Sequence, residues 1–167
     1  NEDELNELLN LIEKEKKILK TTVPITVKIS PDIEDQNINI ISDLLLKHNV
    51  EALIVSNTTD KNRENLSNIN KLEKGGLSGK PLEKRSNELI NKFYKILKNK
   101  IKIIGVGGVD SGQSAYQKII SGASLIQLYT GMIYQGPSIA SKISEELINI
   151  LDKEGVKNIS DIVGSKN

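Results

Sequence analysis

Residues 103–112, Ile-Ile-Gly-Val-Gly-Gly-Val-Asp-Ser-Gly (IIGVGGVDSG), place an apolar run directly before closely spaced glycines and polar residues. The apolar part has the composition of a buried strand, and the polar residues suit the start of a helix. Glycines at such a turn let backbone amides approach a ligand closely. The stretch therefore predicts a phosphate-binding turn between a strand and a helix.

The rest of the chain repeats this order of strand and helix. Runs of apolar and β-branched residues predict strands over residues 24–30, 52–56, 101–106 and 123–129. The spacing of apolar residues predicts helices over residues 2–20, 34–48, 84–99, 111–121 and 137–153. Residues 60–83 have no such pattern and predict a long loop. Strands separated by helices indicate an α/β fold with a parallel sheet and right-handed crossovers.

The position of the glycine-rich turn distinguishes two parallel folds. A doubly wound sheet has its phosphate turn after the first strand, with the spacing G-x-G-x-x-G. Here the first predicted strand is followed by Pro31-Asp32, and Asp110 stands where the last glycine of that motif would be. Barrels often bind phosphate after strands seven and eight. The sequence therefore predicts the C-terminal half of a (β/α)8 TIM barrel, namely strands five to eight with their helices.

The length of the chain bears on its domain organisation. A barrel of this type typically needs about 250 residues, and four strands cannot close one. We therefore expect residues 1–167 to be the C-terminal part of a single barrel domain, whose N-terminal half lies outside this chain.

Composition and charge argue against several classes of function. The chain has 23 basic and 22 acidic residues and only 3% aromatic residues, which gives no basis for nucleic-acid binding. It has no cysteine and one histidine, so we expect no metal site and assign His48 to the surface. No apolar run reaches the ~20 residues that cross a bilayer, and the highly charged residues 1–20 lack the pattern of a signal peptide.

The first predicted strand contains the most informative single residue. In PITVKIS (residues 24–30), the apolar residues alternate with Thr26, Lys28 and Ser30, so these three polar side chains are expected to face the barrel interior. An inward lysine near the carboxyl end of a strand needs an anionic partner. The alternative is a shorter strand from which the ammonium reaches solvent.

Polar residues also follow the second predicted strand. Ser56-Asn57-Thr58-Thr59 places hydroxyl and amide groups where the active face of a barrel would lie. An amide both donates and accepts hydrogen bonds, which suits a ring that carries carboxylate and imide groups. The alternative is that these residues only shape the local turn.

Two glycine-containing segments complete the candidate site. In GGLSGKPL (residues 75–82), Ser78 and Gly79 are suited to present backbone groups to a phosphate; the alternative is a flexible linker. LYTG (residues 128–131) ends the fourth predicted strand, beside the turn after the third. Two neighbouring strand ends that offer amides indicate a phosphate site more strongly than one does. The alternative for the glycines is close packing of strand against helix.

Together, these segments resemble the dihydroorotate dehydrogenase family, in its quinone-linked, membrane-associated class 2. The resemblance runs from about Asn1 to Gly164 and rests on VKISPD, IVSNTT, GGLSGKPL, IIGVGGVDSG, KIISGASLIQLYTGMIYQGP and DIVGS, in this order. It implies an FMN-binding barrel that oxidises dihydroorotate to orotate. FMN would be the hydride acceptor and a quinone the final electron acceptor, in de novo pyrimidine (UMP) biosynthesis.

The resemblance also implies roles for individual residues. Asn57 and Thr58 would hold dihydroorotate. The residues that would bind FMN are Lys28, Ser56, Ser78, Gly79, Gly107, Gly108, Tyr129 and Thr130. The backbone of the last two would bind the FMN phosphate, so that the phosphate expected at the opening stretch is that of the cofactor.

Other parts of the family pattern fall outside the chain. The serine base of the family corresponds to a position upstream of Asn1, and the membrane-binding helices and quinone tunnel lie further upstream. We therefore expect no catalytic residue in this chain, no activity of the chain alone, and peripheral attachment of the protein to a bacterial or mitochondrial inner membrane. Three alternatives stay open: a soluble class 1-type enzyme with another acceptor, a non-catalytic phosphate-binding half-barrel module, and a phosphosugar-type barrel enzyme without flavin.

Overall fold

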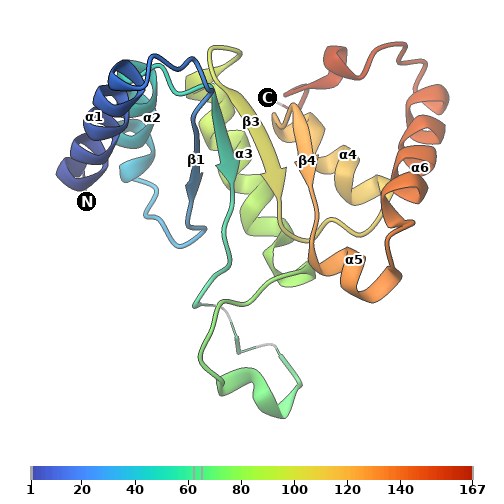
Figure 1. Ribbon diagram of the computed structural model, residues 1–167. Coiled ribbons are helices and arrows are strands. Elements are labelled where there is room, and N and C mark those ends of the chain that lie inside the picture. Colours follow the sequence, from blue (N-terminus) through green and yellow to red (C-terminus); the bar gives the residue numbers. More distant parts are fainter. Residues whose placement is uncertain (1, 62, 65, 167) are drawn as a thin grey trace.

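The computed structural model describes residues 2–61, 63–64 and 66–166 (Figure 1). Its strands are β1 (Thr26–Ile29), β2 (Ala52–Val55), β3 (Lys102–Val106) and β4 (Leu125–Gln127). Its α-helices are α1 (Glu2–Ile18), α2 (Asn37–Lys47), α3 (Glu83–Leu97), α4 (Gly112–Ser121), α5 (Thr130–Gln135) and α6 (Ile139–Lys153). Short 3₁₀ turns are η1 (Ile69–Leu72), η2 (Lys80–Leu82) and η3 (Ile159–Ile162).

The four strands form one parallel sheet in the order β1-β2-β3-β4. Each strand therefore lies beside the next strand in the sequence, and each connection between two strands contains an α-helix. This order is that of a (β/α) barrel wall and differs from a doubly wound sheet, in which the strand order reverses. The prediction of an α/β fold with a parallel sheet in barrel order is confirmed.

One face of the sheet carries the hydrophobic core. Leu53, Val55 and Ile103 are fully buried and pack in one cluster with Leu89 and Phe93 of α3. Figure 1 shows α3 and α4 behind the sheet, on this face. Burial of large apolar side chains stabilises such a layer by about 1.5–3 kcal/mol for each residue, so this face holds the strands in register.

The other face of the sheet is bare in the described residues, and in Figure 1 no helix lies in front of it. The strand register places Lys28, Ile54, Ile104 and Leu125 in one row across this face. Lys28 is exposed and Leu125 is 61% exposed. Alternation along the strands therefore puts Lys28 on the face opposite the core, as the sequence predicts.

Several elements differ from the sequence predictions. β1 and β4 are shorter than predicted because both are edge strands, which pair on one side only and leave the ladder earlier. Helix α5 was not predicted, since six residues are too few to show a helical period. The predicted loop at residues 60–83 contains two of the 3₁₀ turns, η1 and η2.

The prediction that His48 lies on the surface is wrong. Only 3% of its side chain is exposed. Its Nδ1 lies 2.8 Å from Glu13 Oε1, and its Nε2 lies 3.0 Å from Asn6 Oδ1. Both partners belong to α1, which covers the ring at the end of α2. His48 joins two helices and does not line the cleft described below.

Tyr94 of α3 connects the C-terminal segment to the helix layer. Its hydroxyl donates a hydrogen bond to the carbonyl oxygen of Val163 at 2.9 Å. The ring also occupies the space beside Gly164, where an added Cβ would lie 2.0 Å from Tyr94 Cε1. Val163 and Gly164 are therefore part of the packed structure.

Replacing Tyr94 by phenylalanine should lower the free energy of unfolding by about 1 kcal/mol, the usual net value of one intramolecular hydrogen bond. Urea unfolding measures this change. Tyr116→Phe is the control, because its hydroxyl bonds the exposed Glu154 at 2.6 Å, where water competes for both groups. The control should lose less than half as much stability, and equal losses would contradict the anchoring role of Tyr94.

Lys118 of α4 is fully buried in the helix layer. Burial lowers its pKa from 10.5 to about 8. The unfolded chain therefore binds a proton more tightly than the folded chain between these two pKa values. Unfolding takes up a proton in this window, so the contribution of Lys118 to stability should rise with pH there.

The measurable prediction concerns the difference between the unchanged chain and the variant Lys118→Met. From about pH 8 to about pH 10.5, the unchanged chain should gain stability relative to the variant, because its lysine loses the charge that burial disfavours. Urea midpoints at about pH 7 and about pH 10 test this. A difference that is independent of pH would show that the ammonium is not destabilised in the folded chain.

Candidate ligand-binding cleft

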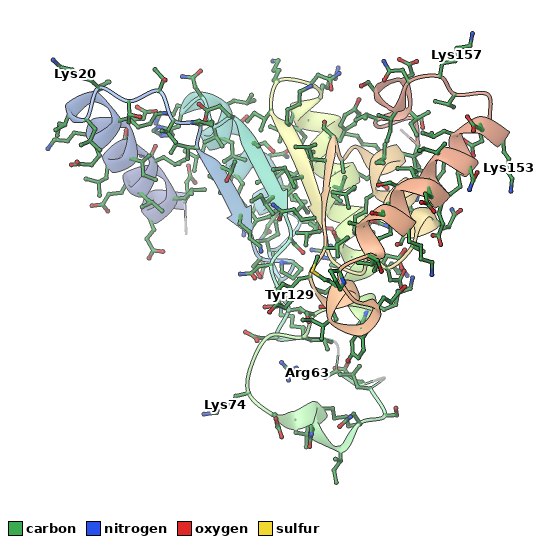
Figure 2. All side chains as sticks on the ribbon, turned by 45° about the vertical axis from the view of Figure 1, so that its right-hand side comes forward. Lys20, Arg63, Lys74, Tyr129, Lys153 and Lys157 are labelled. Carbon is green, nitrogen blue, oxygen red and sulfur yellow. The ribbon has the colours of Figure 1, made fainter. Side chains whose placement is uncertain are left out.

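A cleft with a volume of about 670 Å³ opens at the carboxyl ends of the strands. This volume lies in the range of small-molecule sites. In Figure 1 the strands point toward one edge of the sheet, and the 3₁₀ turn η1 lies below that edge. Figure 2 shows Tyr129 at the same edge, with Arg63 and Lys74 on the loop beneath it.

The structure brings together all ten residues that the sequence analysis selected for binding. The cleft is lined by Lys28, Ser56, Asn57, Thr58, Ser78, Gly79, Gly107, Gly108, Tyr129 and Thr130. They come from segments up to about a hundred positions apart in the chain, and meet because the carboxyl ends of parallel strands share one edge. Thr59, the last residue of the predicted polar cluster, is instead buried and donates a hydrogen bond to Asp32 Oδ1.

The glycine-rich turn after β3 forms one wall of the cleft. Gly107 and Gly108 have φ angles of 110° and 75°, which side chains rarely adopt. An added Cβ at Gly108 would lie 2.6 Å from Glu83 Cβ, so the turn lies directly against the start of α3. Ser111 then caps α4, since its side chain accepts a hydrogen bond from Ser114 N and Ser114 Oγ accepts one from Ser111 N.

The backbone amides of Gly107, Gly108 and Tyr129 donate no hydrogen bond to any residue that the structure describes. Amides of this kind are normally paired in proteins, with protein groups, water or ligand. All three belong to residues that line one cleft, just after the neighbouring strands β3 and β4, and amides grouped in this way suit an anion.

The last part of the loop, residues 78–82, forms a second side of the cleft. Thr130 Oγ1 donates a hydrogen bond to Ser78 Oγ at 3.0 Å. Gly79 has a φ of 80°, and an added Cβ there would lie 2.9 Å from Thr130 Cγ2. The loop therefore returns to the end of β4 with no room for a larger residue at Gly79.

Residues after β2 are held between the two neighbouring strands. Ser56 N donates to Val106 O at 3.2 Å, and Asn57 N donates to Ile29 O at 2.7 Å. The peptide bond between Val55 and Ser56 is cis. The side chains of Asn57 and Thr58 are exposed at the cleft, where they offer hydrogen-bonding groups to a ligand.

Two lysines, Lys28 and Lys80, line the cleft, and only Lys80 forms ion pairs with carboxylates of the described residues. Lys80 Nζ lies 2.8 Å from Glu83 Oε2 and 3.2 Å from Asp110 Oδ1. The hydrogen bond to Glu83 raises the pKa of Lys80 above its ordinary value. Lys28 forms no ion pair or hydrogen bond with a described residue. The positive charge of Lys80 is therefore compensated, whereas that of Lys28 is open to a ligand.

The cleft also contains residues that the sequence analysis did not select, among them Asp110, Gln127 and Tyr134. Gln127 lies on the same sheet face as Leu125, so period-two alternation along β4 was a signal that could have found it. The pairing of Asp110 with Lys80 joins positions 30 residues apart, and no local pattern indicates it. Tyr134 belongs to the unpredicted helix α5.

The described residues lack two further features. They contain no group of three or more His, Cys, Asp or Glu side chains that could hold a metal ion. None of their helices is both long and apolar enough to cross a membrane.

The parallel sheet and the cleft at its carboxyl edge define the class of this chain as an α/β protein of the barrel type. Comparison with known families is more specific: the sequence model of the family described as dihydroorotate dehydrogenase matches residues 1–151. The chain belongs to the dihydroorotate dehydrogenase family.

Individual relatives agree with this assignment. "Dihydroorotate dehydrogenase (quinone)" of Trichodesmium erythraeum is 42% identical over 100% of this chain and 45% of its own length. "Dihydroorotate dehydrogenase (quinone), mitochondrial" of Arabidopsis thaliana is 42% identical over 85% of this chain and 31% of its own length. The chain thus spans less than half the length of these relatives.

A solved structure shows which fold the chain shares. The crystal structure of DHODH in complex with ferulenol from Eimeria tenella matches with a TM-score of 0.93 and 34% identity, over 99% of this chain and 49% of that chain. The sheet of this chain therefore corresponds to about half of a dihydroorotate dehydrogenase barrel. The predictions of the family and of a half-barrel fold are confirmed.

Proposed function

We propose that residues 1–167 are the FMN-binding C-terminal part of a quinone-dependent dihydroorotate dehydrogenase, which oxidises dihydroorotate to orotate in de novo pyrimidine biosynthesis. The observation that carries the proposal is the cleft itself. Residues from five separate segments meet there, and three of the lining residues have backbone amides without a partner among the described residues. The relatives that bear this enzyme's name support the reaction.

The groups of the cleft fit FMN. The amides of Gly107, Gly108 and Tyr129 suit its phosphate, and Gly79 lines the cleft where its backbone packs against Thr130. Bound FMN would supply the two-electron redox chemistry of the reaction. Lys28, whose charge is not compensated, would stabilise negative charge on the flavin ring.

Other polar groups of the cleft suit the substrate. The amide of Asn57 and the hydroxyl of Thr58 would hold the carboxylate and ring amide groups of dihydroorotate, since both side chains are exposed there. Ser56 and Ser78 would contact the cofactor from the ends of β2 and of the loop. These side chains orient the ligands, and none of them is assigned the removal of a proton.

The proposal extends to the organisation of the complete protein. Residues 1–167 would form one domain together with an N-terminal half that carries the catalytic base, the membrane-binding segment and the quinone site. The enzyme would lie peripherally at a bacterial or mitochondrial inner membrane, and it would have no nucleic-acid partner. Support comes from the word "quinone" in the names of relatives and from the mitochondrial label of the Arabidopsis protein.

The first test is an anaerobic visible spectrum of a complete barrel, before and after addition of dihydroorotate. A complete barrel here means this chain joined to the first half of its own protein or of the Trichodesmium erythraeum relative. We expect a flavin band that bleaches with substrate and returns with a quinone. A band that persists would contradict the substrate, and the absence of a band would contradict the FMN site.

Reoxidation separates the proposal from a soluble class 1-type enzyme. If the bleached flavin is reoxidised rapidly by a short-chain ubiquinone, the acceptor is the one proposed. If it is reoxidised only by a water-soluble acceptor, the class assignment is wrong, although the FMN barrel remains.

A further inference from the structure

The buried Lys118 occupies an unusual chemical environment in the helix layer. Its Nζ donates hydrogen bonds to Ser86 Oγ at 3.0 Å and to Asn87 Oδ1 at 2.9 Å. Within the part of the chain that the structure describes, it forms no ion pair with a carboxylate. A buried charge without an opposite charge is destabilising, so packing alone gives no reason for a lysine rather than an apolar residue.

Ser86 connects this lysine to the sheet. Its hydroxyl oxygen lies 2.7 Å from the carbonyl oxygen of Val106 and 3.2 Å from that of Val55. Val106 O also accepts the hydrogen bond from Ser56 N. Ser86 is thus bonded at the two points where β2 and β3 end and the lining of the cleft begins.

The direction of these hydrogen bonds is fixed by chemistry. An ammonium group only donates, so Lys118 must use a lone pair of Ser86 Oγ. The single hydroxyl proton is then directed toward the strand carbonyls. Donation from a charged group also polarises the hydroxyl and strengthens the bond that it gives in turn.

Ser86 also packs against the glycine-rich turn after β3. An added Cβ at Gly107 would lie 3.5 Å from Ser86 Cβ, so the first residue of the turn lies directly against Ser86. On the other strand, the residue after Val55 is Ser56, which lines the cleft. A shift of Ser86 would therefore move two parts of the cleft lining: the glycine-rich turn after β3 and Ser56 after β2.

We propose that Lys118 is a positioning residue that acts through Ser86 to fix the carboxyl ends of β2 and β3, and with them the residues that bind the cofactor. Lys118 itself does not line the cleft. The inference rests on the proposed function of the cleft, and it adds a residue that touches neither cofactor nor substrate.

The test uses the complete barrel and three variants: Lys118→Met, Ser86→Ala, and the two changes combined. The measured quantity is the dissociation constant of FMN, from quenching of flavin fluorescence in protein from which the flavin has been removed. Each single variant should bind FMN about five- to tenfold more weakly, the effect of about one hydrogen bond. The double variant should bind FMN no more weakly than the single variant with the larger loss. Both changes break the same connection from Lys118 through Ser86 to the strand ends, so their effects should not add.

Ser42→Ala is the matched control. Ser42 is also fully buried on a helix, and its hydroxyl donates to Ile38 O at 2.8 Å within α2, away from the cleft. It should lose stability but keep its FMN dissociation constant within twofold of the parent. The flavin absorption band gives a second readout: it should shift or lose fine structure in the Lys118 and Ser86 variants and stay unchanged in the control.

The outcomes separate the inference from the function on which it rests. A parent barrel without flavin would overturn the proposed function and the inference together. A parent that binds flavin, with both single variants within twofold of it, would overturn the inference alone and leave Lys118 a structural residue. Additive losses in the double variant would also overturn it. If Lys118→Met does not fold, Ser86→Ala decides, because it leaves Lys118 bonded to Asn87.

Discussion

Replacing Lys28 by alanine in the complete barrel should slow the reduction of bound flavin by dihydroorotate at least about 100-fold, the usual effect of removing one preorganised electrostatic group. Lys28 lies on the bare face of the sheet and lines the cleft. Its ammonium has no partner among the described residues, whereas the other lysine of the cleft is held by two carboxylates. Anaerobic stopped-flow absorbance at the flavin band measures the rate.

Two variants make this test specific. Lys28→Arg keeps the charge but changes its shape, so it should retain more activity than Lys28→Ala. Lys157→Ala removes a lysine that points away from the molecule at the far corner of the structure (Figure 2), and it should reduce flavin at the parent rate. Near-normal reduction in Lys28→Ala would contradict the role that we give to its charge. The midpoint potential of bound FMN should also become more negative in that variant alone.

In the complete barrel, the variant Gly108→Ala should have a lower free energy of unfolding than the parent and should retain less FMN. The left-handed φ of 75° costs about 1–2 kcal/mol for a side chain. The new Cβ would lie 2.6 Å from Glu83 Cβ and 2.9 Å from Glu83 Cα, and overpacking of this kind costs about 1–3 kcal/mol. We therefore expect a loss of about 2–5 kcal/mol. Urea unfolding and the ratio of flavin to protein after purification measure the two effects.

Gly155→Ala separates backbone strain from the contact with Glu83. Gly155 has a similar φ of 69°, but no atom lies within 4 Å of an added Cβ. The substitution should therefore cost only the backbone strain of about 1–2 kcal/mol, and the flavin content should be normal. If the two variants lose the same stability, the close approach of the turn to α3 is not what requires glycine.

The cleft could be predicted from sequence because its residues follow local rules. Alternation in PITVKIS places Lys28 on one face, and the motifs at residues 56–58, 78–79, 107–108 and 129–130 each follow a strand or a loop glycine. In a parallel sheet, strand ends share an edge, so order along the chain becomes proximity in space. The resemblance to a known family then supplied the chemistry that the pattern alone did not.

Contacts that join distant helices could not be predicted in this way. His48 is buried by α1, where its partners Glu13 and Asn6 precede it by 35 and 42 positions. The bond from Lys118 to Ser86 spans 32 positions between α4 and α3. Helical spacing tells which side of each helix is apolar, but not which polar side chain meets a neighbour on another helix. Such pairs depend on how the helices pack, and so they required the structure.

The bare face of the sheet should make this chain prone to associate with other copies of itself. It carries a row of apolar side chains, Ile54, Ile104 and Leu125. β1 and β4 are edge strands in the described sheet, and their outer backbone groups are free to pair with other chains. Apolar side chains beside such edges favour pairing between molecules over solubility. A preparation of this chain alone should therefore precipitate or form fibrous material as its concentration rises, and joint synthesis with a matching first half should keep it in solution.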